Sequence, residues 1–235
     1  MKLLLLSSSR AGNSAYLAPA LPQIASHLTG ITKLLFVPYA GVSIDYEQYL
    51  QLVQTALLPL AITVTSSHHA SDPVQAVQQA DAIAIGGGNT FRLLQQLYQH
   101  QLIEAIKAKV ASGTPYIGWS AGSNVAGLSI RTTNDMPIIE PPSFAALQLL
   151  PVQLNPHYLN LTAAGFHGET RDMRLNEFML LNPATPVIGL PEGTSLLRNG
   201  ATLTYLGDED GYLFIGGSKT ALLPGADLSA FLSGQ

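Results

Sequence analysis

The sequence predicts an α/β fold in which a mostly parallel sheet is flanked by helices. Short apolar segments alternate along the chain with segments whose apolar residues recur every three or four positions. Hydrophobic residues make up 47% of the chain and charged residues only 11%, which indicates a large buried fraction. One apolar segment runs directly into Ser120, which has small neighbours, as in the elbow that carries the nucleophile of many hydrolases.

Five segments in the first half of the chain are typical of strands covered on both faces, because they are apolar without interruption. They span residues 2–7, 33–38, 61–65, 81–85 and 115–119. The helices between them are predicted over residues 14–28, 45–58, 72–79 and 90–112. Asp72 and Pro73 have the residue types of a helix N-cap and first turn. This alternation predicts parallel strands joined by helical crossovers.

The second half of the chain is less regular. Residues 131–142 have no periodicity and contain two consecutive prolines, so they are predicted as a loop. We then expect a strand, a long loop, a helix and a second strand at residues 150–154, 155 to about 170, 171–182 and 187–190, followed by short β-segments to the end. No internal repeat or linker is visible, so residues 1–235 are expected to form a single domain.

The composition argues against several classes of function. The formal net charge is −4 and Lys and Arg form no cluster, which disfavours nucleic acid and anionic membranes as partners and favours a small molecule. Cysteine is absent, so disulfides, thiol catalysis and sulfur-ligated zinc are excluded. The first apolar run is short for a signal peptide, and no stretch approaches the roughly 18 apolar residues of a membrane helix. We therefore expect a cytoplasmic location.

Residues 118–122 form a Gly-x-Ser-x-Gly motif at the end of a predicted strand. A sharp turn from strand to helix crowds the serine backbone, and only small neighbours leave room for it. The unpaired N–H groups at the start of the helix can hold an oxyanion. Residues 86–89 form a second glycine-rich turn after another strand. We therefore predict Ser120 as a nucleophile and the N–H groups of Gly88 and Ala121 as its oxyanion hole.

Ser120 needs a base, because a hydroxyl is a poor nucleophile at neutral pH. His157 lies in a loop after a predicted strand, so its side chain is expected at the same edge of the sheet as Ser120. His68 and His69 are adjacent, and neighbouring side chains on an extended chain point in different directions. We therefore predict His157 as the base and no metal site.

Two acids qualify as the third member of a triad, the group that orients the histidine and stabilises its charged form. Asp135 would give the chain order Ser, Asp, His, as in α/β-hydrolases. Glu192 would give the order Ser, His, Glu, and it lies on a tight turn directly after a strand. The residues alone leave this choice open.

Six motifs occur in order at residues 85–91, 116–124, 130–137, 155–157, 167–171 and 187–193. Together they resemble the peptidase E family of aspartyl dipeptidases, serine peptidase family S51, over roughly residues 3–197. This resemblance implies a serine peptidase on a flavodoxin-like fold akin to class I glutamine amidotransferases. It also implies removal of an N-terminal aspartate from dipeptides, with no metal or other cofactor. The family's serine and histidine fall on Ser120 and His157, and its acid falls on either Asp135 or Glu192.

A substrate with an N-terminal aspartate carries an ammonium and a β-carboxylate close together, so a selective pocket needs a cation for one and acceptors for the other. The residues expected to bind it are Arg171 and Arg131 for the carboxylate, Glu169 for the ammonium, and Asn89 and Asn124 for further hydrogen bonds. Three rivals stay open: a cyanophycinase-like or isoaspartyl peptidase, a general esterase, and an amidotransferase-like module that binds a small acidic ligand without turnover. The oligomeric state, monomer or homodimer, stays open too.

Overall fold

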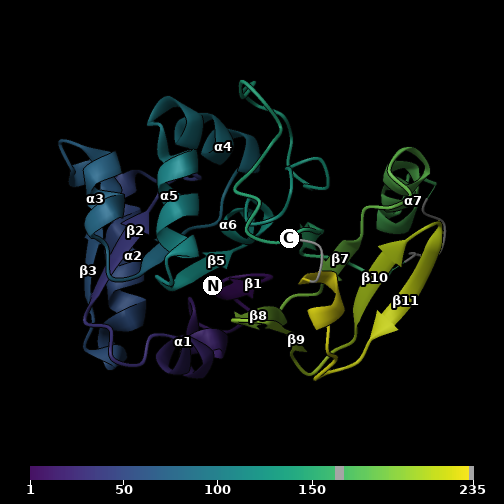
Figure 1. The fold of residues 1–235 in the computed structure, drawn as a ribbon, viewed down its shortest axis with the longest axis horizontal. Coiled ribbons are helices and arrows are strands. Elements are labelled where there is room, and N and C mark those ends of the chain that lie inside the picture. Colours follow the sequence, from purple (N-terminus) through teal and green to yellow (C-terminus); the bar gives the residue numbers. More distant parts are fainter. Residues whose placement is uncertain (162–166, 233–235) are drawn as a thin grey trace.

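The computed structural model describes residues 1–161 and 167–232 and contains two sheets (Figure 1). The larger sheet has the strand order β3-β2-β4-β5-β1-β8-β9. The five strands from β3 to β1 are parallel, and β8 and β9 are antiparallel to their neighbours. These strands are β1 (Lys2–Leu6), β2 (Lys33–Val37), β3 (Thr63–Ser66), β4 (Ile83–Ile85), β5 (Tyr116–Trp119), β8 (Ser195–Asn199) and β9 (Thr202–Leu206).

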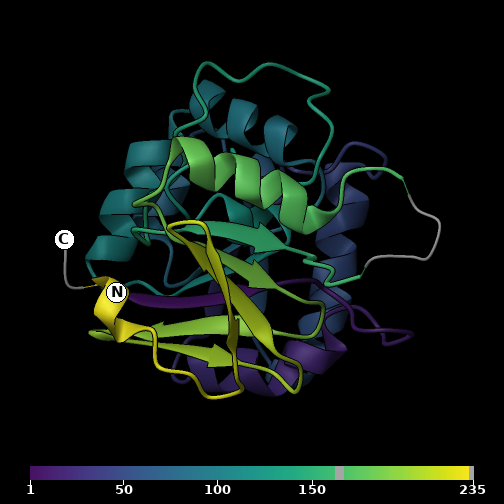
Figure 2. The same cartoon turned by 90° about the vertical axis from the view of Figure 1, so that its right-hand side faces the viewer.

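The smaller sheet has the order β11-β10-β7-β6 and lies beside the larger one, with helix α7 (Arg171–Leu181) across it (Figure 2). Its strands are β6 (Gln153–Pro156), β7 (Val187–Leu190), β10 (Gly211–Ile215) and β11 (Ser218–Leu222). Only β6 and β7 pair in parallel. Leu175 and Met179 of α7 pack against Val187 and Phe214 of this sheet. The sequence did not lead us to expect a second sheet.

Helices cover both faces of the larger sheet, which confirms the predicted fold class. They are α1 (Leu21–His27), α2 (Tyr46–Leu57), α3 (Pro73–Gln79), α4 (Thr90–Gln99), α5 (Leu102–Ala111) and the short α6 (Ala121–Asn124). In β1, Leu4 and Leu6 face α1 and α2, whereas Leu3 and Leu5 belong to the core under α3, α4 and α5. Both faces of the strand are buried, which explains its uninterrupted apolar run.

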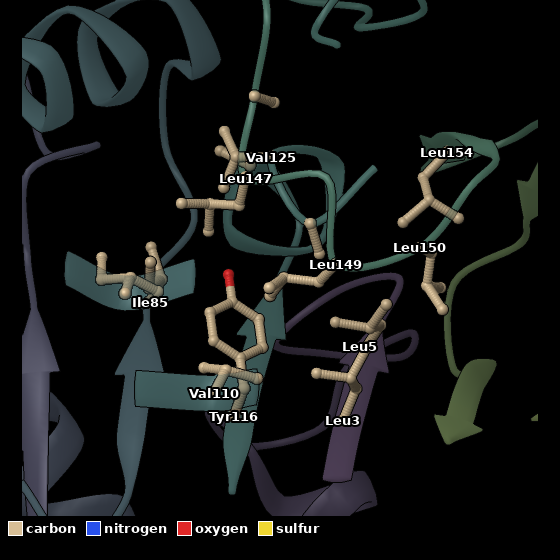
Figure 3. Close-up of a cluster of buried hydrophobic side chains, with 14 of the residues drawn as sticks. Leu3, Leu5, Ile85, Val110, Tyr116, Val125, Leu147, Leu149, Leu150 and Leu154 are labelled. Carbon is tan, nitrogen blue, oxygen red and sulfur yellow. The ribbon is translucent and has the colours of Figure 1, made fainter. Parts of the chain in front are cut away.

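Tyr116 of β5 lies in the core between the sheet and the helices (Figure 3). It is fully buried, and its hydroxyl donates a 2.6 Å hydrogen bond to the carbonyl of Gly122. Burial raises the pKa of this phenol, so it stays neutral. Val125, Leu147 and Leu149 belong to the same buried cluster as Tyr116.

Two predicted helices are shorter or broken in the structure. The helix expected over residues 90–112 is interrupted at Gln101, whose φ of 56° ends α4 and starts α5 in a new direction. The helix expected over residues 14–28 begins only at Leu21, after a 3-10 turn. Leu17 has a left-handed φ of 57°, which an α-helix does not contain, and Pro22 lies in the first turn of α1, where proline suits the start of a helix. The spacing of apolar residues does not reveal either interruption.

The remaining boundaries are close to those predicted. The strand expected at residues 150–154 is shifted to Gln153–Pro156, whereas residues 187–190 match β7 and residues 131–142 form the expected loop. Asp45 and Asp72 cap α2 and α3 through their side chains. None of the helices in the described residues is both long and apolar enough to cross a membrane.

Candidate active site

Ser120 joins β5 to α6 in a strained turn. Its backbone has φ 53° and ψ −115°, a conformation that a residue with a side chain rarely adopts. The turn is possible because the residues two positions before and after Ser120 are glycines: a Cβ on Gly118 would overlap the carbonyl of Gly122, and a Cβ on Gly122 would overlap that of Ile85. The Ser120 hydroxyl therefore stands at the carboxyl end of β5, as the elbow motif predicts.

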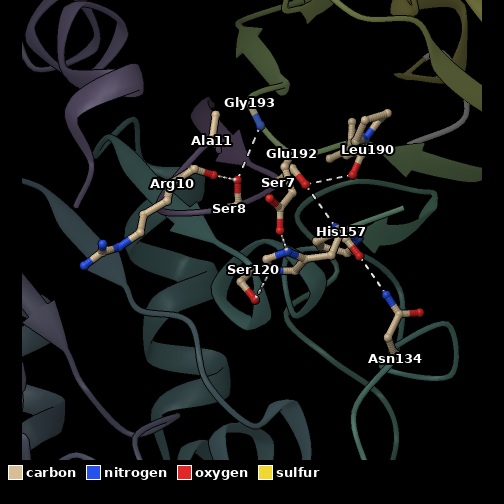
Figure 4. A network of polar contacts seen from close by, with 12 residues as sticks. Ser7, Ser8, Arg10, Ala11, Ser120, Asn134, His157, Leu190, Glu192 and Gly193 are labelled. Atoms are coloured by element: carbon tan, nitrogen blue, oxygen red, sulfur yellow. Dashed lines mark hydrogen bonds and ion pairs between the residues drawn. The ribbon is translucent and has the colours of Figure 1, made fainter. Parts of the chain in front are cut away.

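His157 lies beside Ser120 although it comes from the smaller sheet. It follows β6 directly, and its N–H donates to the Ser7 hydroxyl at 2.9 Å, while Ser7 donates to Leu190 at 2.7 Å. Ser7 thus ties the ends of β1, β6 and β7 together (Figure 4). The Nε2 atom of His157 lies 2.9 Å from Oγ of Ser120, which is hydrogen-bond distance for a base and its nucleophile.

Glu192 completes a chain of three side chains. Its Oε1 lies 2.8 Å from Nδ1 of His157, on the side of the ring opposite to Ser120 (Figure 4). The turn that carries Glu192 follows β7 and is closed by Thr194, whose N–H and hydroxyl both donate to the carbonyl of Pro191. About half of the Glu192 side chain is exposed. The arrangement is that of a serine, histidine and acid triad.

Asp135 makes different contacts. Its Oδ2 accepts hydrogen bonds from the N–H of Thr90 at 2.7 Å and from the Thr90 hydroxyl at 2.6 Å. A carboxylate at this place satisfies an unpaired N–H at the start of α4 and interacts favourably with the helix dipole. In the structure Asp135 therefore holds the loop of residues 131–142 against α4, and it makes no hydrogen bond to His157.

The turn after β4 supplies backbone donors next to Ser120. Gly88 has φ 135°, and a Cβ there would overlap the carbonyl of Ala40, so only glycine fits. The N–H groups of Gly88 and Ala121 have no hydrogen-bond acceptor among the described residues. Both belong to turns at the carboxyl edge of the sheet, where an oxyanion can accept from them.

A cavity of about 440 Å³ opens at Ser120 and His157. Apart from His157, its described lining contains no acidic or basic side chain. The apolar and aromatic residues in the lining are Tyr16, Ala40, Val42, Ile44, Tyr49, Leu52, Trp119 and Ile138. The Trp119 N–H donates to the Tyr16 hydroxyl at 2.9 Å, and the Tyr49 hydroxyl donates to the Gly87 carbonyl at 2.9 Å. Burial raises the pKa of both phenols, so the wall carries no charge.

Arg171 is the first residue of α7, and Asn134 links it to Pro156, the residue before His157. Its Nη1 donates to Oδ1 of Asn134, which also accepts from Asn155 at 2.7 Å, and Nδ2 of Asn134 donates to the Pro156 carbonyl at 2.8 Å. Burial lowers the pKa of Arg171 from its ordinary value. Its Nε is buried without a hydrogen-bond partner, and no carboxylate pairs with it within the described residues. The guanidinium thus has unused capacity for an anion.

The other predicted substrate ligands lie in different settings. Asn89 lines the cavity, caps α4 through its Oδ1 and donates to the Met136 carbonyl. Asn124 is buried and donates to the Leu154 carbonyl at 2.7 Å. Glu169 pairs with Arg174 at 3.5 Å, on the exposed side of α7. Arg131 is exposed and forms no ion pair within the described chain.

Sequence reasoning missed two positioning residues, Ser7 and Asn134. Ser7 is one of three consecutive serines after β1, and nothing in that run distinguishes it. Asn134 precedes Asp135 in a segment predicted as a loop, and no local pattern marks it as a partner of Arg171. Its position between Arg171 and the end of β6 depends on the packing of two elements far apart in the chain.

Comparison with known proteins agrees with this geometry. The model of "Peptidase family S51" matches residues 3–206. Proteins named peptidase E from Shewanella denitrificans and Shewanella baltica are 54% and 56% identical over 230 residues, covering 97% of this chain and 98% and 97% of theirs.

Two crystal structures share the fold. The structure of a putative peptidase E from Listeria monocytogenes has a TM-score of 0.68 at 22% identity, over 88% of this chain and 98% of that one. A peptidase from an acI-B1 actinobacterium has a TM-score of 0.71 at 19% identity, over 97% and 96% of the two chains. With a family match over most of its length and close relatives along nearly all of it, the chain belongs to peptidase family S51 and is a peptidase.

Proposed function

We propose that this serine dipeptidase hydrolyses dipeptides that begin with L-aspartate, and that Ser120, His157 and Glu192 form its catalytic triad. The observation that carries the proposal is the hydrogen-bonded chain of these three side chains, with distances of 2.9 Å and 2.8 Å at its two links. The buried and partly unpaired guanidinium of Arg171 supports it, because Asn134 links Arg171 to Pro156, the residue before His157. The names of the relatives support the same activity.

The geometry supports acyl transfer through a covalent intermediate. Oγ of Ser120 attacks the peptide carbonyl carbon while Nε2 of His157 takes its proton. When the tetrahedral intermediate collapses, the C–N bond breaks and His157 gives that proton to the leaving amine. Water then attacks the ester carbonyl carbon while His157 takes its proton. The bond between that carbon and Oγ of Ser120 breaks, His157 returns the proton to Oγ, and free aspartate leaves. Glu192 accepts from Nδ1–H throughout, which orients the ring and stabilises the imidazolium.

The N–H groups of Gly88 and Ala121 are proposed as the oxyanion hole. They lie at the start of α6 and in the turn after β4, the two backbone segments that meet at Ser120. Donors fixed in this way act on the charge that develops in the transition state, and they need no reorganisation.

Arg171 is proposed as the ligand of the aspartate β-carboxylate. A guanidinium forms two parallel hydrogen bonds with a carboxylate, and one of its buried nitrogens has no partner among the described residues. The cost of that unpaired donor disappears when the substrate carboxylate arrives. The apolar cavity at Ser120 and His157 would then hold the side chain of the leaving residue. A cytoplasmic location and a small-peptide partner stay part of the proposal.

Rates on three dipeptides test this substrate. Asp-Leu should be cleaved well, whereas Asn-Leu lacks the charge and β-linked Asp-Leu misplaces the scissile bond, so both should be at least about a hundredfold slower in kcat/KM. Arg171→Met should remove most of the preference for Asp-Leu over Asn-Leu. Equal rates on Asp-Leu and Asn-Leu in the wild type would refute the charged pocket, and faster cleavage of the β-linked peptide would indicate an isoaspartyl peptidase.

A further inference from the structure

Glu47, His68 and His69 converge at a second place on the carboxyl edge of the larger sheet. Their ligand atoms all lie within 4.8 Å of one another. Oε2 of Glu47 is 3.5 Å from Nε2 of His68 and 2.8 Å from Nε2 of His69. The two rings have centroids 4.0 Å apart. None of the three side chains lines the cavity at Ser120, so the peptidase reaction makes no use of this cluster.

The fold brings these side chains together from two elements. Glu47 lies in the first turn of α2, just after the N-cap Asp45. His68 and His69 lie in a 3-10 turn that follows β3, so they are not on an extended chain as the sequence reasoning assumed. Because β2 and β3 are parallel neighbours, the turn after β3 lies beside the connection from β2 to α2. The cluster is therefore built on rigid elements.

The hydrogen bonds of His68 direct a lone pair into the cluster. Its Nδ1 lies 2.6 Å from the hydroxyl of Ser66, and that hydroxyl donates to the Phe36 carbonyl at 3.3 Å. The hydroxyl therefore accepts from Nδ1–H, which leaves the lone pair of Nε2 facing the carboxylate of Glu47. Two acceptors that face each other across 3.5 Å repel unless a cation lies between them.

We propose that Glu47, His68 and His69 bind one Zn²⁺ ion, with a water molecule in the fourth position. Two imidazole nitrogens and one carboxylate oxygen are a ligand set that suits zinc, whereas Ca²⁺ and Mg²⁺ prefer oxygen ligands alone. Metal-bound histidines almost always donate their other ring N–H to a fixed partner, and Ser66 is that partner for His68. The ion would tie the start of α2 to the end of β3.

Zinc titration of the metal-free full chain tests the proposal by calorimetry. The wild type should bind one equivalent of Zn²⁺. Glu47→Gln, His68→Gln and His69→Gln should each abolish that saturable step, and Ser66→Ala should weaken it by about 10- to 100-fold because only the outer partner is lost. Glu104→Gln and His167→Gln are matched controls, since both residues are exposed and lie outside the cluster, and they should bind as the wild type does.

Two further measurements separate binding from misfolding. Zn²⁺ should raise the Tm of the wild type but not that of His69→Gln, a change at an exposed side chain that should leave the fold intact. Co²⁺ should give visible absorption bands of a low-symmetry site in the wild type and in both controls, Glu104→Gln and His167→Gln, but not in the three ligand variants. If the wild type does not bind one equivalent of Zn²⁺ saturably, the cluster is a plain ion pair between Glu47 and His69 and not a metal site. That result, or undiminished binding by all three ligand variants, overturns the proposal.

Discussion

At the scale of single residues, the fold separates the roles of two carboxylates that the sequence presents as equivalent. Glu192 accepts from the ring of His157, whereas Asp135 accepts from both donors of Thr90. Glu192 can stabilise the positive charge of the imidazolium, whereas Asp135 stabilises the start of α4. Their substitution should therefore affect different measurements.

Glu192→Gln should lower kcat by about 10²- to 10⁴-fold with little change in Tm, because an amide does not stabilise the imidazolium and can select the wrong tautomer. Asp135→Asn should keep kcat within about a few fold but lower the free energy of unfolding by about 1 kcal/mol, the usual worth of a helix cap. Steady-state kinetics and urea unfolding of both variants check this. If only Asp135→Asn lost kcat, Asp135 would be the acid of the triad and Glu192 would not.

The pairing of Ser120 with His157 could be predicted because each follows a strand, but the single sheet edge expected for them was wrong. His157 follows β6 of the smaller sheet, and Ser7 holds that strand end against the end of β1 in the larger sheet. The choice of acid could not be predicted, since both candidates lie in loops and only packing decides which loop reaches the imidazole. The contacts of Glu169 and Asn124 could not be predicted from the sequence either. One makes an ion pair along α7 and the other is buried against Leu154, and neither contact has a local pattern.

At the scale of elements, α1 packs on the larger sheet through a histidine. Nε2 of His27, the last residue of α1, lies 3.2 Å from the carbonyl of Tyr116 and donates to it when the ring is neutral. Burial, the dominant cause, lowers the pKa of His27 to about 4. Folding therefore favours the uncharged ring.

The stability of the wild type should consequently fall as the pH drops from about 6.5 to about 4, because in this range the His27 ring is protonated in the unfolded chain but not in the folded one. Above pH 6.5 the ring is neutral in both states and contributes no pH dependence. The contribution lost is at most about 3 kcal/mol. Urea unfolding at several pH values should show a weaker slope for His27→Gln than for the wild type, and an unaltered slope for the exposed control His167→Gln. Identical slopes in wild type and His27→Gln would contradict the buried neutral ring.

The strands of the first half could be predicted because alternate residues of β1 and β2 enter opposite cores, which makes each strand apolar throughout. The break at Gln101 could not, since a single left-handed residue leaves the apolar spacing on both sides intact. The smaller sheet could not be predicted for another reason: β10 pairs with β7 although β8 and β9, which belong to the larger sheet, lie between them in the chain, and the apolar pattern of a strand does not identify its partner.

At the scale of the whole molecule, the site lies between two sheets. The larger sheet supplies Ser120 and the backbone donors, and the smaller sheet with α7 supplies His157, Glu192 and Arg171. The scissile bond must then lie across the junction. In the proposed reaction, Arg171 binds the first residue of the substrate and the uncharged cavity holds the side chain of the second.

This arrangement predicts selection of the leaving residue. Asp-Leu and Asp-Phe should have a kcat/KM about tenfold or more above that of Asp-Glu and Asp-Lys, because a charged side chain would lose its hydration in a cavity without a partner. Ile138→Lys places a cation in the lining and should raise the rate on Asp-Glu while lowering that on Asp-Lys. Met136→Lys is the matched control, since Met136 lies in the same loop, is 74% exposed and does not line the cavity.

Competition between Asp-Leu and Asp-Glu in one reaction gives the ratio of kcat/KM directly for each variant. The ratio should shift toward Asp-Glu in Ile138→Lys and change much less in Met136→Lys, because a side chain that is 74% exposed and outside the cavity lining keeps its charge in water, where the interaction is weak. A shift of equal size in both variants would mean that general electrostatic attraction, and not the cavity, selects the second residue. A wild type that cleaves Asp-Glu as fast as Asp-Leu would place the leaving side chain outside the cavity while leaving the aspartate site intact.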